Sequence, residues 1–186
     1  MFITIIIGAI LLFATIGVRA FGYTPIYSLL VIVFLTILVV IQDGVFAALI
    51  RKLPAKYFDH SRKGFDASKK ERKFYDFIQI KFWKDYVPEL GGFTNFHKDK
   101  IRESNNLQYL ERFILECNYG SAIHIFTALS GFIILFALPS SQMLIFGVPV
   151  AVVNLFLNLM PAFILRYNVP RLRTLHKMAK RKAKGQ

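Results

Sequence analysis

The sequence predicts an all-α integral membrane protein, with four transmembrane helices and a membrane-associated amphipathic segment on the cytosolic side. Of the 186 residues, 55% are hydrophobic, and they form long uninterrupted blocks. The chain has 24 Lys and Arg residues and 11 Asp and Glu residues, which gives a net charge of +13. The basic residues lie almost entirely outside the apolar blocks. We therefore expect the bilayer to be the solvent for much of the chain, and the basic segments to contact anionic lipid headgroups or phosphate-bearing ligands.

Four apolar blocks are each long enough, at about 20 residues, to cross a hydrocarbon core. The first follows Met1 directly, with no basic region before it, so we interpret it as a retained helix and not as a secretory signal. The last two blocks are separated by a turn at Pro139, Ser140 and Ser141. The predicted spans are residues 2–18, 28–50, 120–138 and 142–165.

The distribution of Lys and Arg predicts the orientation, because cytoplasmic flanks carry the positive excess. Residues 51–118 hold 15 of them, residues 166–186 hold 8, and the connection between the first two spans holds only Arg19. Both termini and the long middle segment are therefore expected in the cytoplasm. The predicted organisation is a first hairpin (1–50), a basic cytosolic segment with interfacial helices (51–118), a second hairpin (119–165) and a basic cytosolic tail (166–186).

An amphipathic helix is predicted within the middle segment. Residues 74–82 place phenylalanines at helical spacing, and a basic stretch at 69–73 precedes them. This mixture favours a helix at the membrane surface over the alternative, a helix packed on a small cytosolic subdomain. A proline and two glycines at 88–92 should end it, and a new helical pattern from residue 107 should run directly into the third span.

Three polar side chains are expected at membrane depth near the cytosolic side: Asp43 in the second span, His124 in the third and Asn158 in the fourth. An ionisable group in a span is costly and tends to mark a functional site. The alternative for His124 is a neutral imidazole bonded to a neighbouring helix. A pair such as Asn154 and Asn158, one turn apart, is more often a contact between helices than a ligand site. Glu116 precedes His124 by about 12 Å of rise and about 80° of rotation, so a continuous helix excludes a direct hydrogen bond between them.

The cysteine and histidine content argues against two classes of protein. The single cysteine, Cys117, cannot form an internal disulfide. Four His with one Cys show no zinc-type ligand spacing, so no metal site is expected.

The basic tail has two parts in this interpretation. From Lys177 onward it is expected to be a solvated, orienting flank. Arg166, Asn168 and Arg171, together with Pro170, form a compact polar cluster where the fourth span leaves the membrane.

Four motifs occur in order along the chain: L-P-A-K-Y-F at 53–58, K-F-x8-W-K at 73–84, E-x7-H at 116–124 and R-Y-N-V-P-R-L at 166–172. In this order and spacing they resemble the glycosyl-4,4'-diaponeurosporenoate acyltransferases, small bacterial membrane enzymes of carotenoid end-group modification. The resemblance covers about residues 50–175. It implies a multi-pass enzyme of the bacterial cell (inner) membrane that moves a fatty acyl group onto a sugar hydroxyl of a glycosylated carotenoid acid or similar glycolipid. The implied co-substrate is an acyl-CoA or acyl-carrier thioester, with no bound cofactor.

Acyl transfer to a hydroxyl requires a general base, and a neutral imidazole suits this role near pH 7. The expected catalytic residues are His124 as the base, with Asp43 or Glu116 as the carboxylate that orients it. Which of the two carboxylates does so is left open by the sequence.

Substrate-binding groups are expected at the cytosolic headgroup level. Amide and guanidinium donors would stabilise the developing oxyanion, and cations would bind the phosphates of an acyl-CoA. The expected partners are lipid substrates and anionic membrane lipids, not nucleic acid. The predicted residues are Trp83, Lys84, Asn158, Arg166, Asn168 and Arg171.

The alternative function is non-enzymatic: a four-helix membrane scaffold or lipid-binding subunit, in which the buried polar groups only join helices. No G-x-S-x-G motif or Gly-rich phosphate loop competes with the acyltransferase interpretation. A transporter is disfavoured because no internal repeat is visible. A change at His124 that abolishes the product without reducing membrane accumulation would distinguish the enzyme from the scaffold.

Overall fold

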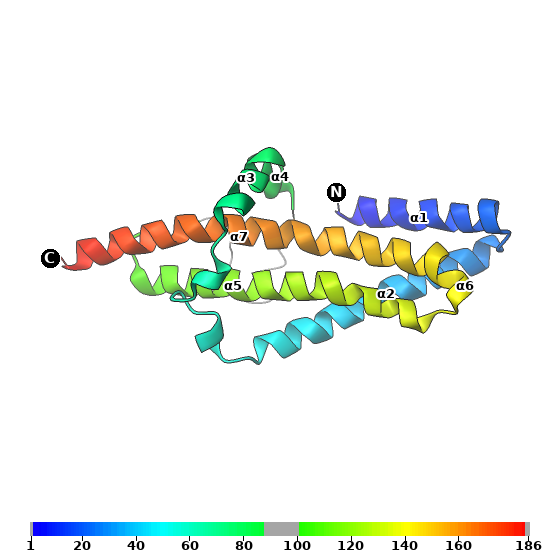
Figure 1. The fold of residues 1–186 in the computed structure, drawn as a ribbon, viewed down its shortest axis with the longest axis horizontal. Helices are drawn as coiled ribbons and strands as arrows, with labels where there is room; N and C mark the ends of the chain where they lie inside the picture. The colour runs from blue at the N-terminus through cyan, green and yellow to red at the C-terminus, as the bar shows by residue number, and fades with distance from the viewer. Residues whose placement is uncertain (1, 88–100, 185–186) are drawn as a thin grey trace. The chain divides into compact units, whose positions relative to one another are not determined.

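The computed structural model describes residues 2–87 and 101–184, and in this part of the chain it is all-helical, without a β-strand (Figure 1). The expected all-α class is therefore confirmed. The α-helices are α1 (Phe2–Phe21), α2 (Pro25–Arg51), α3 (Lys69–Phe77), α4 (Ile80–Trp83), α5 (Leu107–Ser130), α6 (Ser140–Gln142) and α7 (Val148–Lys184). Short 3-10 helices are η1 (Ala55–Tyr57), η2 (Lys63–Phe65), η3 (Lys84–Tyr86) and η5 (Gly131–Ala137), and a π-helical turn, η6, covers Met143–Gly147.

Three helices of the described chain, not four, are long and apolar enough to cross a membrane. They are α2, the helix that continues from α5 through η5 (Leu107–Ala137), and the helix that contains α7 (Ser140–Lys184). The prediction of four spans is wrong in this respect, because the described apolar part of α1 covers only Ile6–Phe21. At 1.5 Å per residue this stretch is about 24 Å long, less than the roughly 30 Å of a hydrocarbon core.

The last two long helices extend beyond the apolar blocks that predicted them. Helix α5 begins at Leu107 and continues without interruption into the apolar residues, as expected. Helix α7 continues through Pro161 and Pro170 to Lys184, so the basic tail is helical. The side chains of that tail expected to bind substrate are consequently carried by a helix.

The described chain folds as two compact units. The first comprises the described residues of 2–49 and 125–159, and the second those of 50–87, 101–124 and 160–184. In the first unit, apolar residues of α2 pack against η5 and the start of α7, and partly buried residues of α1 join them. Gly17 of α1 lies so close to its neighbours that a Cβ there would be 2.9 Å from the Phe146 ring. A side chain at this position would therefore separate α1 from η6.

The core of the second unit forms between α5 and α7, which lie side by side (Figure 1). Leu110, Phe113, Ile114 and Cys117 follow helical spacing along one face of α5 and are almost fully buried. They pack against the face of α7 that includes Leu165, Val169 and Leu172. Because these two apolar faces are buried against each other, the opposite faces of α5 and α7 point away from this core.

Helices α3 and α4 replace the single amphipathic helix expected at 74–82. Ser68 and Glu71 form a capping box that begins α3, and Gln79, with φ of 52°, separates α3 from α4. A non-glycine residue in the left-handed region ends a helix, which the hydrophobic pattern alone did not show. The predicted stop at 88–92 lies outside the described residues.

Candidate functional site

A buried polar network lies in the first unit, among apolar residues. Asn158 of α7 donates from Nδ2 to Asp43 Oδ2 of α2 at 2.8 Å and to Asn154 Oδ1 at 2.9 Å. Its Oδ1 accepts from Thr127 Oγ1 of α5 at 2.9 Å. The sequence predicted that Asp43 and Asn158 lie at the same depth, and in the structure the two side chains form a hydrogen bond between α2 and α7.

The carboxylate of Asp43 has unused hydrogen-bonding capacity. Its Oδ1 is buried and accepts no hydrogen bond from the part of the chain that the structure describes. A buried oxygen without a donor is costly, so this atom is suited to receive a proton donor from another group. The neighbouring Gln42 donates to the carbonyl of Ser130 at 2.7 Å, where α5 ends.

The polar network adjoins an apolar groove in the same unit. The groove has an empty volume of about 460 Å³, partly open to the surroundings, and Asn154 is one of its two polar lining residues. The other, Thr36, satisfies its hydroxyl within α2 by donating to the carbonyl of Ile32. The remaining lining residues are Ile6, Ala9, Ile10, Phe13, Ile32, Val39, Val40, Pro149, Val150, Val153 and Leu157.

His124 is a half-buried residue of α5. It precedes Thr127 by three residues, and residues three apart on a helix lie on the same face. Orientation of His124 by Asp43 stays a prediction.

Glu116 has a partner in the second unit. Arg51, at the end of α2, donates from Nη1 to Glu116 Oε2 at 2.8 Å and lies over the ring of Tyr119. Because α5 is one helix from Leu107 to Ser130, the offset of Glu116 from His124 excludes a direct hydrogen bond, as argued from the sequence. Its contact with Arg51 gives Glu116 a role in holding the end of α2 to α5.

Arg166 makes a two-point ion pair in the second unit. Its Nε and Nη2 donate to the two carboxylate oxygens of Glu71 at 2.7 and 3.0 Å. These hydrogen bonds lower the pKa of Glu71 to about 2. Burial raises the pKa of Tyr75, which donates to Glu71, to about 12. The guanidinium of Arg166 therefore joins α7 to the start of α3.

The other residues expected to bind substrate have different environments. Trp83 donates from its indole to the carbonyl of Ile78 at 2.9 Å and packs in a buried cluster with Tyr75 and Ile80. Lys84 pairs with the adjacent Asp85 at 3.1 Å. On α7, Asn168 is half-buried and Arg171 is exposed. Arg171 is therefore accessible to a charged ligand, whereas Trp83 is held within the fold.

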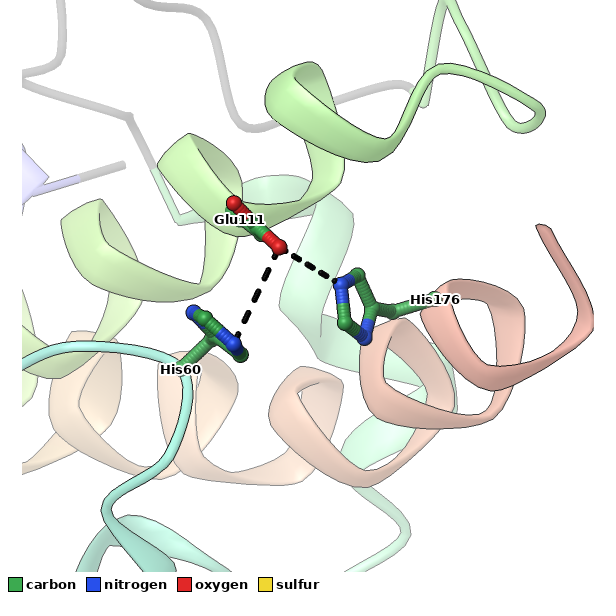
Figure 2. A group of neighbouring side chains, drawn as sticks. All are labelled: His60, Glu111 and His176. Carbon is green, nitrogen blue, oxygen red and sulfur yellow. Dashed lines mark hydrogen bonds and ion pairs between the residues drawn. The ribbon is translucent and has the colours of Figure 1, made fainter. Parts of the chain in front are cut away.

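A third group of polar residues, in the second unit, was missed from the sequence. His60, Glu111 and His176 converge from the loop after η1, from α5 and from α7 (Figure 2). Glu111 Oε1 lies 2.9 Å from His176 Nε2 and 3.8 Å from His60 Nε2. No local pattern marks this group, because tens of residues separate its members and only the tertiary fold brings them together.

The described part of the chain is all-helical, and three of its helices are long and apolar enough to cross a membrane, which is typical of helical membrane proteins. Within that class, the chain belongs to the glycosyl-4,4'-diaponeurosporenoate acyltransferase family, whose model matches residues 54–178. The chain is thus a member of a family of acyltransferases, which confirms the resemblance carried by the four motifs. No curated protein and no solved structure matches the chain.

Proposed function

We propose that this protein transfers a fatty acyl group from an activated thioester to a sugar hydroxyl of a glycosylated carotenoid acid or a similar glycolipid. The observation that carries the proposal is the family match over residues 54–178, which include His124, the motif at 73–84 and all but the first residue of the motif at 53–58. The long apolar helices agree with substrates that reside in a membrane. We place the reaction in the bacterial cell membrane, at the level of the cytosolic headgroups.

The apolar groove of the first unit is the proposed site for a hydrocarbon chain. Its lining is aliphatic or aromatic apart from Thr36 and Asn154, so it offers no hydrogen bonds along most of its length. A fatty acyl chain or a polyene needs none and gains stability by burying its surface. Asn154 joins this groove to the network around Asp43.

The proposed chemistry is nucleophilic acyl substitution assisted by His124. The imidazole removes the proton of the sugar hydroxyl as the oxygen attacks the thioester carbonyl, and a tetrahedral oxyanion forms. When this intermediate collapses, the C–S bond breaks and the imidazolium returns the proton to the leaving thiolate. The products are the sugar ester and a free thiol.

Supporting residues have distinct roles in this proposal. Asn158 donates its amide hydrogens to Asp43 and Asn154, so its role is to hold the carboxylate of Asp43 in place. The oxyanion donor is then Asn168, and Arg166 positions α3 through Glu71. Phosphates of an acyl-CoA would bind the exposed Arg171.

Helices α3 and α4 supply the proposed contact with the membrane surface. Tyr75 and Ile80 are buried against α7, whereas Phe77 and Phe82 are 83% and 75% exposed. The exposed phenylalanines accompany basic residues such as Lys73 and Lys81. This composition is typical of a segment that inserts aromatic rings at the headgroup level, with cations on anionic lipids.

Lipid mass spectrometry tests the proposed reaction. Cells supplied with a glycosylated carotenoid acid should accumulate its fatty acyl ester when they express the wild-type chain. They should accumulate none with His124→Gln at equal membrane abundance. Ester formation by a well-expressed His124→Gln protein would remove His124 from the chemistry, and absence of the ester with the wild type would favour the scaffold.

Cysteine labelling tests the proposed orientation. Cys117 is buried, so Cys117→Ala provides a background for single cysteines at Lys63 and Lys177. Both positions are expected to react only from the cytosolic side, because their segments carry the positive excess. A further cysteine at Thr4 reports on which side α1 begins, and labelling of Lys63→Cys from outside would contradict the orientation.

A further inference from the structure

We infer that His60, Glu111 and His176 form a binding site for one divalent transition-metal ion of the zinc type. Their ligand atoms all lie within 4.8 Å of one another, and the two imidazole rings are 5.0 Å apart. Figure 2 shows the Glu111 carboxylate between the two imidazoles. The inference uses only the second unit and does not rest on the proposed acyl transfer.

The distances fit a metal better than they fit hydrogen bonds alone. A hydrogen bond explains the 2.9 Å between Glu111 and His176, but 3.8 Å from Glu111 to His60 is too long for one. Around Zn²⁺, with ligands at about 2.1 Å, neighbouring donor atoms of a tetrahedron are about 3.4 Å apart. The observed distances bracket this value, so small side-chain movements would complete the coordination.

The backbone that carries His60 is held in place from both helices. On α7, Arg173 donates to the carbonyl of His60, and at 2.6 Å to that of Arg62. Arg173 is three residues from His176, so the residue that fixes the loop and the proposed ligand share one face of α7. The imidazole of His60 is thereby presented to His176 before any metal binds.

Helix α5 contributes in the same way. Asn118 donates from Nδ2 to the carbonyl of Phe58 at 2.7 Å. Asn118 follows Glu111 by seven residues, close to two helical turns, so both side chains project from the same face of α5. A site whose ligands are positioned by surrounding hydrogen bonds loses little entropy when it binds a metal.

The three ligands leave a coordination position open. The side chains of His60 and Glu111 are 40% and 41% exposed, whereas that of His176 is only 11% exposed. Two imidazoles and one carboxylate with solvent access match the donor set of zinc sites that keep a fourth position for water or a substrate oxygen. The ion would also join the loop after η1 to α5 and α7.

Metal titration of the full chain tests this site. The protein is purified in detergent without a histidine tag, stripped with a chelator and titrated with Co²⁺, whose visible absorption reports coordination by nitrogen and oxygen. We expect saturation at one Co²⁺ per chain, displacement by Zn²⁺, and a rise in Tm with Zn²⁺. Failure of the wild type to saturate at one equivalent would overturn the inference, whatever the variants do.

Variants locate the bound ion. His60→Ala, Glu111→Gln and His176→Ala should each weaken Co²⁺ binding about 100-fold or more, because each removes a direct ligand. Glu103→Gln is the matched control, since Glu103 is an exposed carboxylate bonded only locally to Asn106 in the described structure, and it should bind Co²⁺ as the wild type does. Binding by His176→Ala at wild-type affinity would contradict the assignment.

Discussion

The two units of the chain use polar residues in opposite ways. In the first unit, the carboxylate of Asp43 accepts from a neutral group, the amide of Asn158, which also donates to Asn154 and accepts from the hydroxyl of Thr127. In the second unit, carboxylates are matched with cations, as Glu71 is with Arg166. Among the residues that the structure describes, Oδ1 of Asp43 accepts from no donor, whereas both carboxylate oxygens of Glu71 accept hydrogen bonds.

From this difference we expect the polar groups of the first unit to contribute mainly to activity and the ion pairs of the second unit mainly to stability. Ion pairs of the second unit join α3 and the preceding loop to α7, so their loss should reduce stability first. In the first unit, the carboxylate of Asp43 accepts fewer hydrogen bonds than that of Glu71 does. Removal of this carboxylate should therefore affect activity before stability.

The largest effect is expected at His124 and Asp43. His124→Gln and Asp43→Asn should each reduce the rate of acyl transfer by about 10²- to 10⁴-fold, because each removes part of the proton-transfer apparatus. The double variant should lose scarcely more than either single one, since residues that act as a unit are non-additive. Initial rates with the purified protein measure this, and additive losses would show that the two residues act independently.

Loss of the ion pair in the second unit should lower stability. Arg166→Ala leaves Glu71 half-buried without its main partner and should cost about 2 kcal/mol of unfolding free energy. Arg171→Ala, an exposed arginine of the same helix, is the control and should change stability by less than about 0.5 kcal/mol. Thermal unfolding in detergent gives both values, and equal stability of the two variants would contradict the structural role of Arg166.

The same ion pair predicts a pH dependence with a definite sign. The pKa of Glu71 is lowered from 4.5 to about 2, so its stabilising contribution is complete above pH 4.5 and is lost as the pH falls toward 2. Glu71→Gln lacks this titration. The stability difference between the wild type and Glu71→Gln should therefore shrink between pH 5 and pH 3, and a constant difference would exclude this origin.

A close contact between helices in the first unit can be tested by adding one methyl group. A Cβ at Gly131 would lie 2.4 Å from Asn154 Nδ2, so Gly131→Ala must displace the amide that joins the polar network. We expect a loss of about 1–3 kcal/mol together with reduced activity. Gly44→Ala is the matched control, because nothing lies within 4 Å of its added methyl group, and it should be neutral or slightly stabilising in a helix. Unfolding and rate measurements on both variants test the contact.

The smallest effect is expected at Arg171. If this exposed guanidinium binds a phosphate of the donor equally in the ground and transition states, Arg171→Ala should raise KM for an acyl-CoA about tenfold with kcat unchanged. The side chain then contributes to donor binding alone. An unchanged KM would leave Arg171 with a role in orientation only.

Much of this protein follows from the local sequence. The apolar blocks determine the helical class, because a backbone in lipid must satisfy its own hydrogen bonds. The helical pattern from residue 107 correctly predicted a helix that runs directly into the third apolar block. The four motifs indicated the family, because the order and spacing of short motifs can be recognised without knowledge of the tertiary structure.

Other features depended on the tertiary structure, because they arise between residues distant in the chain. Hydropathy placed Asp43 and Asn158 at one depth, but only helix packing showed that they bond to each other. The net charge of the sequence did not indicate which carboxylate pairs with Arg166. In the structure that carboxylate is Glu71, which also belongs to the capping box of α3. Hydrophobic periodicity likewise did not predict the left-handed conformation of Gln79 or the extension of α7 to Lys184.

The cluster of His60, Glu111 and His176 shows the limit most clearly. Its members lie on a loop and two helices, and no spacing rule for metal ligands covers separations of this length. Their convergence results from the packing of α5 against α7 and from the hydrogen bonds of Arg173 and Asn118 to the loop. The helical class and the family could therefore be read from local patterns in the sequence, whereas contacts such as these depend on how distant segments pack.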